Sequence, residues 1–259
     1  MKQTKIIAIA NQKGGVAKTT TAAAFASGLK LRGYSVLAVD LDPQGNLSDS
    51  SAADNNSKPT IYDVLKGDKS ASEAIQHLDI YDIIPANILL SGAEQEISQI
   101  GKEQRLKEAL ETVKENYDFI IVDTPPALGL LTINAFTAAQ EVLIPTTAGI
   151  FAASGITQLY DTIRNVKKYC NPNVEIIGVL LTKYNPRTNN SKDMKSLTEK
   201  LADYIKAPLY KAYIRQSVIV EEAQTRKVDL FSYRKDSTVV KDYDSFINEY
   251  LEARKVIGE

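Results

Sequence analysis

The sequence has very few of the residues that build disulfides and zinc sites. Its 259 residues contain one cysteine, one histidine and no tryptophan. A single cysteine, Cys170, excludes an internal disulfide, and one histidine beside one cysteine argues against a zinc site. Any metal is therefore expected to be held through oxygen ligands.

Long apolar runs and an excess of charge are also missing. No run of about 18 apolar residues could cross a membrane, and the N-terminus is unlike a signal sequence. The formal net charge is −1, which does not indicate a nucleic-acid binder and does not exclude a local basic face. These absences predict a cytoplasmic protein with no membrane partner.

The hydrophobic residues that are present follow the pattern of a parallel sheet. They make up 44% of the chain, against 24% charged residues, which is ordinary for a globular protein. Short apolar runs alternate with helical stretches, as for strands buried on both faces. The expected strands are Lys5–Ala10, Ser35–Asp40, Tyr81–Pro85, Phe119–Asp123, Glu141–Pro145, Glu175–Thr182 and Pro208–Tyr210. We therefore predict one α/β domain over residues 1–259, with a doubly wound, mainly parallel sheet covered by helices on both faces.

Four segments between these strands also have a clear pattern. Asp49–Pro59 is rich in Ser, Asp and Asn and is predicted to be a loop. A helix start is expected before Ile61–Leu65. Ser72–His77 is predicted to be a short helix, and Glu94–Lys114 an amphipathic surface helix.

Residues 10–21 join the first strand to a helix through a glycine turn. Gly14 and Gly15 let the backbone fold tightly, so that N–H groups and the helix N-terminus can face a phosphate. Lys18 is expected to reach the β- and γ-phosphates, and Thr19 to bind Mg²⁺. This pattern predicts a site for a nucleoside triphosphate. The residues expected to form it are Lys13, Gly14, Gly15, Val16, Ala17, Lys18, Thr19 and Thr20.

The loop departs from the usual G-x-x-x-x-G-K-[ST] pattern, because Gln12 and Ala17 stand where its glycines would be. With Lys13 before the glycine pair, it resembles the deviant Walker A motif, K-G-G-x-x-K-T, of the ParA/MinD/nitrogenase iron protein superfamily of dimeric ATPases. The resemblance implies a P-loop NTPase fold and a Lys13 that reaches the partner subunit's ATP. Members usually have glycine at the Ala17 position. If a positive φ is needed there, alanine costs on the order of 1 kcal/mol.

Acids follow two of the expected strands. Asp40 and Asp42 end one of them, and Asp123 ends another. Residues just past the C-terminal ends of parallel strands face the ligand crevice, where the phosphate loop also lies. The topology therefore places these acids near the phosphates. Without the family resemblance, Asp-Pro and Gly-Asn after a strand could equally be turn residues.

The residues around these acids extend the resemblance. Asp42 stands in D-x-D-P-Q-G-N, which resembles switch I of ParA-type proteins, and Asp123 stands at the Walker B position. The resemblance implies that Asp42 positions the attacking water and that Asp123 binds Mg²⁺ directly or through water. Asp40 is then expected beside Lys18 or Mg²⁺. Residues 127–135 resemble switch II, which can move when the γ-phosphate is lost.

Two later segments resemble the base-binding and DNA-binding parts of short ParA-type proteins. The resemblance makes Asn185 the expected adenine contact, and Arg187 and Arg215 the expected DNA contacts. Residues 183–215 contain eight basic and three acidic residues, so contacts with DNA phosphates are expected to be independent of base sequence. For any single cation among them, a solvated surface residue is the plain alternative.

The motifs occur in the family's order from the first strand to about Lys227. They imply an ATPase with weak intrinsic activity that forms an ATP-bridged homodimer, binds DNA non-specifically and responds to a ParB-type centromere-binding protein. The early position of Lys13 indicates the short form, without an N-terminal helix-turn-helix domain. Such a plasmid or chromosome partition protein is expected on the nucleoid in the cytoplasm.

Three other classes share this motif. The main alternative is a MinD-like membrane-cycling or cargo-positioning ATPase, but membrane cycling needs a basic amphipathic helix at the C-terminus. The acidic residues in and just before Phe246–Lys255 suit docking on the domain better. A nitrogenase-like reductase needs several cysteines for an iron–sulfur cluster, which Cys170 alone cannot supply. A nucleotide-bound structural module without turnover stays open.

Overall fold

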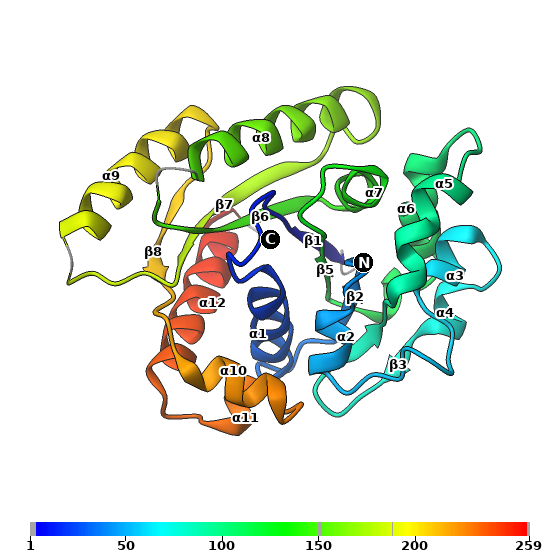
Figure 1. Ribbon diagram of the computed structural model, residues 1–259, viewed down its shortest axis with the longest axis horizontal. Coiled ribbons are helices and arrows are strands. Elements are labelled where there is room, and N and C mark those ends of the chain that lie inside the picture. Colours follow the sequence, from blue (N-terminus) through cyan, green and yellow to red (C-terminus); the bar gives the residue numbers. More distant parts are fainter. Residues whose placement is uncertain (1–3, 150–151, 188, 258–259) are drawn as a thin grey trace.

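An eight-stranded sheet organises the chain (Figure 1). The computed structural model describes residues 4–149, 152–187 and 189–257. The strands are β1 (Lys5–Ile9), β2 (Val36–Asp40), β3 (Gln76–His77), β4 (Asp82–Ile84), β5 (Phe119–Asp123), β6 (Glu141–Thr147), β7 (Glu175–Thr182) and β8 (Leu209–Tyr213). Their order is β3-β4-β2-β5-β1-β6-β7-β8, and all neighbours are parallel except β3 and β4. The predicted mainly parallel α/β fold is confirmed.

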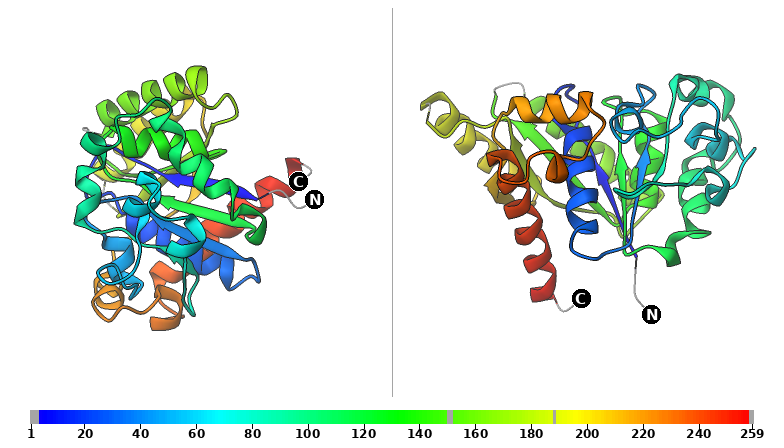
Figure 2. Two further views of the ribbon diagram at one scale, coloured as in Figure 1. Left: turned by 90° about the vertical axis from the view of Figure 1, so that its right-hand side faces the viewer. Right: turned by 90° about the horizontal axis from the view of Figure 1, so that it is seen from below.

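Helices cover both faces of the sheet (Figure 2). The helices are α1 (Lys18–Lys30), α2 (Asn46–Ser50), α3 (Ile61–Lys66), α4 (Ala71–Ala74), α5 (Ala93–Glu96), α6 (Arg105–Glu111), α7 (Leu130–Ala138), α8 (Ala152–Tyr169), α9 (Asn189–Tyr204), α10 (Val218–Thr225), α11 (Leu230–Tyr233) and α12 (Thr238–Ile257). Three short 3₁₀ segments are η1 (Ile88–Gly92), η2 (Lys102–Gln104) and η3 (Lys114–Asn116). Helices α1, α10, α11 and α12 share one core with the sheet, while α6, α7 and α8 share the other.

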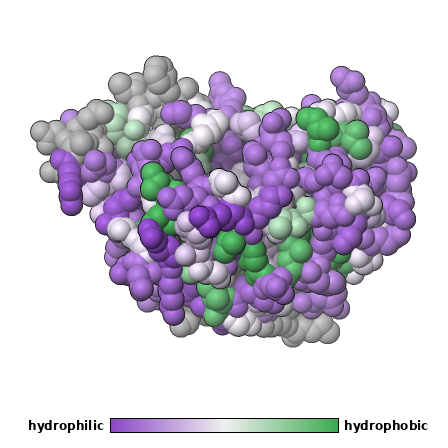
Figure 3. All heavy atoms as spheres, turned by 60° about the horizontal axis from the view of Figure 1, so that its bottom comes forward, coloured by the Kyte–Doolittle hydropathy of each residue, from purple (hydrophilic) through white to green (hydrophobic). Residues whose placement is uncertain are grey.

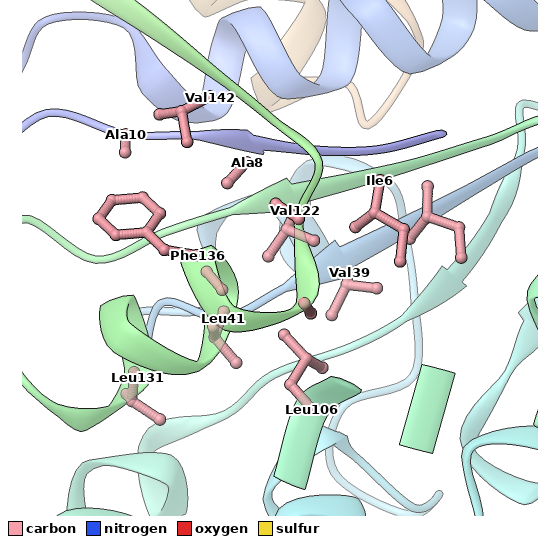
Figure 4. Packing of buried hydrophobic residues seen from close by; sticks show 14 of the residues in the cluster. Ile6, Ala8, Ala10, Val39, Leu41, Leu106, Val122, Leu131, Phe136 and Val142 are labelled. Atoms are coloured by element: carbon pink, nitrogen blue, oxygen red, sulfur yellow. The ribbon is translucent and has the colours of Figure 1, made fainter. Parts of the chain in front are cut away.

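The central strand β1 shows why its sequence is apolar throughout. Ile7 and Ile9 belong to the core beneath α1 and α12, whereas Ile6 and Ala8 belong to the opposite core beside α7 (Figure 4). None of these four side chains is more than 3% exposed. A strand covered on both faces has no polar side, so the run is continuous rather than alternating.

The C-terminal helix α12 docks on the domain. Phe246 is fully buried, with its ring centroid 5.2 Å from Phe25 of α1 and 4.9 Å from Tyr210 of β8. Near the helix end, the Tyr250 hydroxyl donates to the Glu141 carboxylate at 2.8 Å. The expectation that this segment docks on the domain is confirmed. The apolar side of α12 is buried in the core.

No helix in the described ranges is long and apolar enough to span a membrane. The face that carries α10 and α11 is mainly hydrophilic, with hydrophobic residues in separate patches (Figure 3).

The prediction of one helix over Glu94–Lys114 is wrong. The segment is divided among the end of α5, η2, α6 and the start of η3. Gly101 interrupts it with φ 82, a conformation that a continuing helix cannot contain. Ile100, which the helical period placed on the apolar side, is fully exposed.

Two smaller predictions near β4 are also corrected. Ser72–His77 is not one helix, because α4 ends after one turn and Gln76 instead pairs with Ile83. The Gln76 amide also donates to the Asp54 carbonyl at 2.7 Å, a long-range contact that the local pattern did not show. The loop predicted at Asp49–Pro59 begins inside α2, whose last residue is Ser50.

Candidate nucleotide-binding site

The loop between β1 and α1 forms an open turn shaped by its glycines. Gly15 has φ +73, and no described heavy atom lies within 4 Å of a Cβ built on Gly14 or Gly15. Ala17 is the N-cap of α1 and is left-handed, with φ 64 and ψ 34. The backbone therefore does need a positive φ where this chain has alanine. The N-terminus of the 13-residue α1 begins at the open space, as in an anion-binding loop.

Contacts from neighbouring strands hold this loop in place. The Asn11 side-chain amide donates to the Pro145 carbonyl at 2.8 Å, and its oxygen accepts from the Lys13 N–H at 2.9 Å. The Thr182 hydroxyl donates to the carbonyl of buried Val16 at 3.0 Å. Strands β6 and β7 thus fix the loop from one side before any ligand is bound.

A cavity of about 710 Å³ lies over the phosphate loop. This volume is in the range of small-molecule sites. The lining residues that matter for binding are Gly14, Gly15, Ala17, Lys18, Thr19, Thr20, Asp42, Pro126, Lys183 and Arg215. The structure therefore brings most of the predicted site residues together. The predicted site residues that do not line the cavity are Lys13, Val16, Asp40, Asp123, Asn185 and Arg187.

Lys13 lies beside the cavity rather than in it. Its side chain is exposed, and its Nζ donates to the Thr147 hydroxyl at the end of β6, at 3.4 Å. Because the Lys13 side chain is exposed and does not line its own subunit's cavity, its ammonium can face another molecule. Its predicted role toward a partner subunit stays a prediction.

Asp40 ends β2 and is fully buried. One of its carboxylate oxygens accepts from the Ser48 N–H at 2.9 Å and the Ser48 hydroxyl at 2.7 Å, and the other accepts from the Asp42 N–H at 3.2 Å. Burial raises the pKa of Asp40 to about 6, against the opposing effect of the Ser48 hydrogen bonds. With both oxygens already used, Asp40 is better suited to hold the turn after β2 than to bind a metal directly.

Asp123 is the least satisfied group of the site. Its side chain is fully buried, and neither carboxylate oxygen has a hydrogen-bond partner among the described residues. Burial, and then the Asp40 carboxylate, raise its pKa well above the usual value, while Thr19 and Lys18 oppose this rise. Unpartnered carboxylate oxygens beside the Thr19 hydroxyl suit a cation with oxygen ligands. The residues present therefore fit Mg²⁺, which Asp123 and Thr19 would hold.

Lys18 and Asp42 are two charged residues of the cavity lining. Burial lowers the pKa of Lys18, and the charges of Asp123 and Asp42 partly oppose this. Asp42 is 8% exposed, and one of its oxygens accepts from the Gln44 N–H at 3.0 Å. Its position at the cavity wall agrees with a role next to the phosphates.

The segment that resembles switch II is held by a residue that the sequence did not single out. The Leu130 N–H at the start of α7 donates to a Glu94 carboxylate oxygen at 2.6 Å. A Cβ built on Gly129 would lie 2.0 Å from the same oxygen. Glu94 was predicted only as part of an amphipathic helix, and a contact across 36 residues has no local pattern that could reveal it.

The expected DNA and base contacts have different surroundings. Asn185 and Arg187 are both exposed, and the Asn185 side-chain oxygen accepts from the Arg187 N–H at 3.1 Å. Arg215 lines the cavity, and its guanidinium and backbone N–H all bind the carboxylate of Asp242, which is only 7% exposed. Asp242 of α12 was missed by the sequence analysis. It anchors the cavity wall after β8 through Arg215.

We predict that Ala17→Gly stabilises the protein. Relief of the left-handed strain is worth about 1–2 kcal/mol, and the added freedom of the unfolded chain removes about 0.4–1 kcal/mol of this. The expected net gain in the free energy of unfolding is therefore about 0.5–1 kcal/mol, measured by urea denaturation. Ala52→Gly is the matched control, because Ala52 has φ 59 at the end of α2, outside the cavity. A loss of stability confined to Ala17→Gly would contradict the strain argument.

A second prediction concerns the two buried carboxylates. Because their pKa values in the folded state are raised, the folded protein holds more protons than the unfolded chain above about pH 4. The contribution of these two carboxylates to stability, without nucleotide or Mg²⁺, should therefore fall as pH rises from about 4 to 6 and beyond. Asp123→Asn should reduce this fall and raise stability at pH 7.5 by on the order of 1–2 kcal/mol.

The same substitution should abolish Mg²⁺-dependent nucleotide binding, because an amide cannot replace the carboxylate charge. Urea denaturation across pH and nucleotide titration with Mg²⁺ or EDTA check the two halves. Asp68→Asn, at a surface carboxylate, is the control. If Asp123→Asn destabilised the Mg²⁺-free protein throughout this range, the assignment of a buried charge without a partner would be wrong.

Comparison with known proteins agrees with this site. Residues 4–176 match the family model of an AAA domain. The sporulation initiation inhibitor protein Soj of Bacillus subtilis is 42% identical over 233 residues, which cover 88% of this chain and 91% of Soj. The chromosome partitioning protein ParA of Caulobacter vibrioides is 41% identical over 229 residues, covering 85% of this chain and 83% of ParA.

A solved structure from Mycobacterium smegmatis has the same fold. It is described as cobyrinic acid a,c-diamide synthase with a bound ATP analogue and magnesium, and it superposes with a TM-score of 0.85 at 36% identity. The match covers 98% of this chain and 96% of that one. With its deviant phosphate loop, its acid-tipped strands and this similarity to Soj and ParA, the chain belongs to the ParA/MinD-type family of partition ATPases, whose cofactors are ATP and Mg²⁺.

Proposed function

We propose that this ATPase partitions DNA, and that it does so as an ATP-bridged homodimer that binds DNA without sequence preference. The observation that carries the proposal is that the two lysines of the phosphate loop lie in different places. Lys18 lines the cavity of its own subunit, whereas Lys13 lies outside it. The similarity to Soj and ParA supports a ParB-type centromere-binding protein as the partner that stimulates slow intrinsic turnover.

The described residues have separate tasks in this proposal. The glycine turn and the N-terminus of α1 receive the phosphates of ATP, and Lys18 neutralises part of their charge. Asp123 and Thr19 would hold Mg²⁺, which supplies further positive charge to the phosphates. Asp42 lines the same cavity and orients the attacking water. Asp40 holds the turn that carries Asp42 through the Ser48 and Asp42 hydrogen bonds.

A second lysine directed at the nucleotide from the partner subunit couples dimerisation to ATP. In one subunit alone, Lys13 interacts with Thr147 and with solvent. When two cavities face one another, each Lys13 can add its charge to the phosphates of the opposite site. The dimer is then favoured only while the triphosphate is present.

The two lysines should therefore fail in different ways. We predict that Lys18→Ala lowers ATP affinity by at least about tenfold, because its charge belongs to the subunit's own site. Lys13→Ala should leave ATP affinity nearly unchanged and should lose the ATP-dependent dimer or its turnover. Nucleotide titration, light scattering and phosphate release measure these effects. Normal ATP-dependent dimerisation and turnover of Lys13→Ala would refute the role across the dimer.

DNA binding is proposed for the exposed segment around Arg187. Single contacts with phosphates are weak, so two copies in one dimer bind far better than one copy alone. Arg215 has a different position, because Asp242 holds its guanidinium at the cavity wall. Replacing Arg215 by glutamate would place a second carboxylate beside Asp242 and disturb the wall itself. Arg215 is therefore the less direct test of the DNA face.

We predict that Arg187→Glu weakens DNA binding by about tenfold or more at low salt, while ATP-dependent dimerisation is unchanged. The affinity of the parent should be indifferent to sequence and should fall steeply with salt. Arg164→Glu is the control, since Arg164 is a similarly exposed arginine on α8. DNA co-sedimentation without nucleotide, with ADP and with ATP checks this. A parent that ignores DNA at low salt with ATP would remove the DNA part of the proposal.

The MinD-like alternative differs from the partition proposal in what it requires of the C-terminal helix. Membrane cycling needs apolar side chains that are free to enter lipid, but Phe246, Ile247 and Tyr250 of α12 are at most 2% exposed. This burial favours a partition protein that acts on the nucleoid in the cytoplasm. A cargo other than DNA could use the same ATP cycle. Co-sedimentation with anionic liposomes in the presence of ATP distinguishes the membrane alternative from a protein that moves DNA or another cargo.

A further inference from the structure

Left-handed backbone at residues other than glycine identifies one more residue of the site. In the described part of the chain, five such residues have positive φ: Ala17, Ala52, Lys183, Lys206 and Lys227. Three of them directly follow the C-caps of α2, α9 and α10, a place where a left-handed residue is ordinary. The other two, Ala17 and Lys183, end no helix. Both line the cavity, as Lys227 after α10 also does, so among the described non-glycine residues only Ala17 and Lys183 have left-handed backbone at the cavity without this ordinary explanation.

The backbone on both sides of Lys183 is held in place. Before it, the Thr182 hydroxyl donates to the Val16 carbonyl at 3.0 Å, which ties the end of β7 to the phosphate loop. After it, the Tyr184 N–H donates to the Ile214 carbonyl at 3.0 Å, and the Tyr184 side chain is only 5% exposed. The chain must turn between these two contacts, which gives Lys183 a φ of 51.

A lysine is a poor residue for this turn on backbone grounds. Glycine adopts the left-handed region more easily because it has no Cβ to crowd the following carbonyl, and asparagine because its short polar side chain can hydrogen-bond locally. Strained positions persist where the surroundings determine them, and they gather at functional sites. What lysine offers in exchange is a positive charge on an exposed residue that lines the same cavity as the phosphate loop.

We propose that the Lys183 ammonium contacts the nucleotide bound in this cavity and increases its affinity. The inference rests on the proposed function, because it requires the cavity to hold a nucleotide. The other lining cations have other places in the fold: Lys18 belongs to the phosphate loop, Arg215 is held by Asp242, and Lys227 follows the C-cap of α10. Lys183 adds a positive charge from β7, on a backbone whose direction is set by the phosphate loop itself. This differs from the expectation that the cations from Lys183 onward serve DNA.

The test compares the same substitution at two left-handed lysines. Lys183→Asn removes the charge and keeps a residue suited to positive φ. Lys206→Asn makes the identical change at φ 56 after α9, outside the cavity. Lys183→Arg keeps the charge. Dissociation constants for a fluorescent ATP analogue with Mg²⁺ are measured for each variant at low and high salt, with thermal denaturation as the folding check.

Lys183→Asn should bind the ATP analogue about tenfold more weakly than the parent, with a smaller loss of affinity on adding salt. Lys183→Arg and Lys206→Asn should stay within about threefold, and both asparagine variants should be at least as stable as the parent. Equal affinities of Lys183→Asn and the parent would overturn the inference. So would normal ATP affinity with weakened DNA binding, which would leave the proposed function intact. A parent that binds no ATP would remove both.

Discussion

Two buried carboxylates at neighbouring strand ends set the terms for the whole site. Asp40 and Asp123 are paired in register on β2 and β5, and both are fully buried. Two like charges in such a place are costly unless each has a partner. Asp40 obtains its partner from Ser48, whereas Asp123 has no hydrogen-bond partner among the described residues. Asp40 thus holds the turn after β2, whereas a bound cation would supply a partner for Asp123.

The backbone around the cavity is also fixed by contacts between neighbouring segments. The left-handed turn at Ala17 and the turn at Lys183 are linked, because Thr182 donates to the carbonyl of Val16. This hydrogen bond holds the phosphate loop and the end of β7 together. Loop and cavity wall are organised before the ligand arrives, which lowers the entropy that binding must remove. Glycine at Ala17 or Lys183 would lower the strain of these turns and would also make their backbone more flexible.

Much of the fold and part of the site could be predicted from the sequence. Strands such as Phe119–Asp123 are continuous apolar runs, and an acid at the end of a parallel strand must lie at the ligand edge. Contacts between distant segments could not be predicted. Glu94 binds the start of α7 and Asp242 binds Arg215, and neither pair is linked by a local period. Gly101 broke a helix that the apolar spacing alone favoured, because spacing carries no information on a positive φ.

The position of Lys13 connects these local constraints to the proposed dimer. A cavity lined by Lys18 but not by Lys13 can bind a triphosphate. The charge of Lys13 then does not neutralise the phosphates bound in its own subunit. In the proposed dimer the second subunit supplies that missing charge, so the phosphates are fully compensated only when two subunits meet. DNA contacts made by each subunit then act together, since a weak site doubled on one rigid body gains far more than twofold in affinity. Under this proposal, loss of the γ-phosphate weakens the link between the subunits, and the weaker dimer in turn releases the DNA.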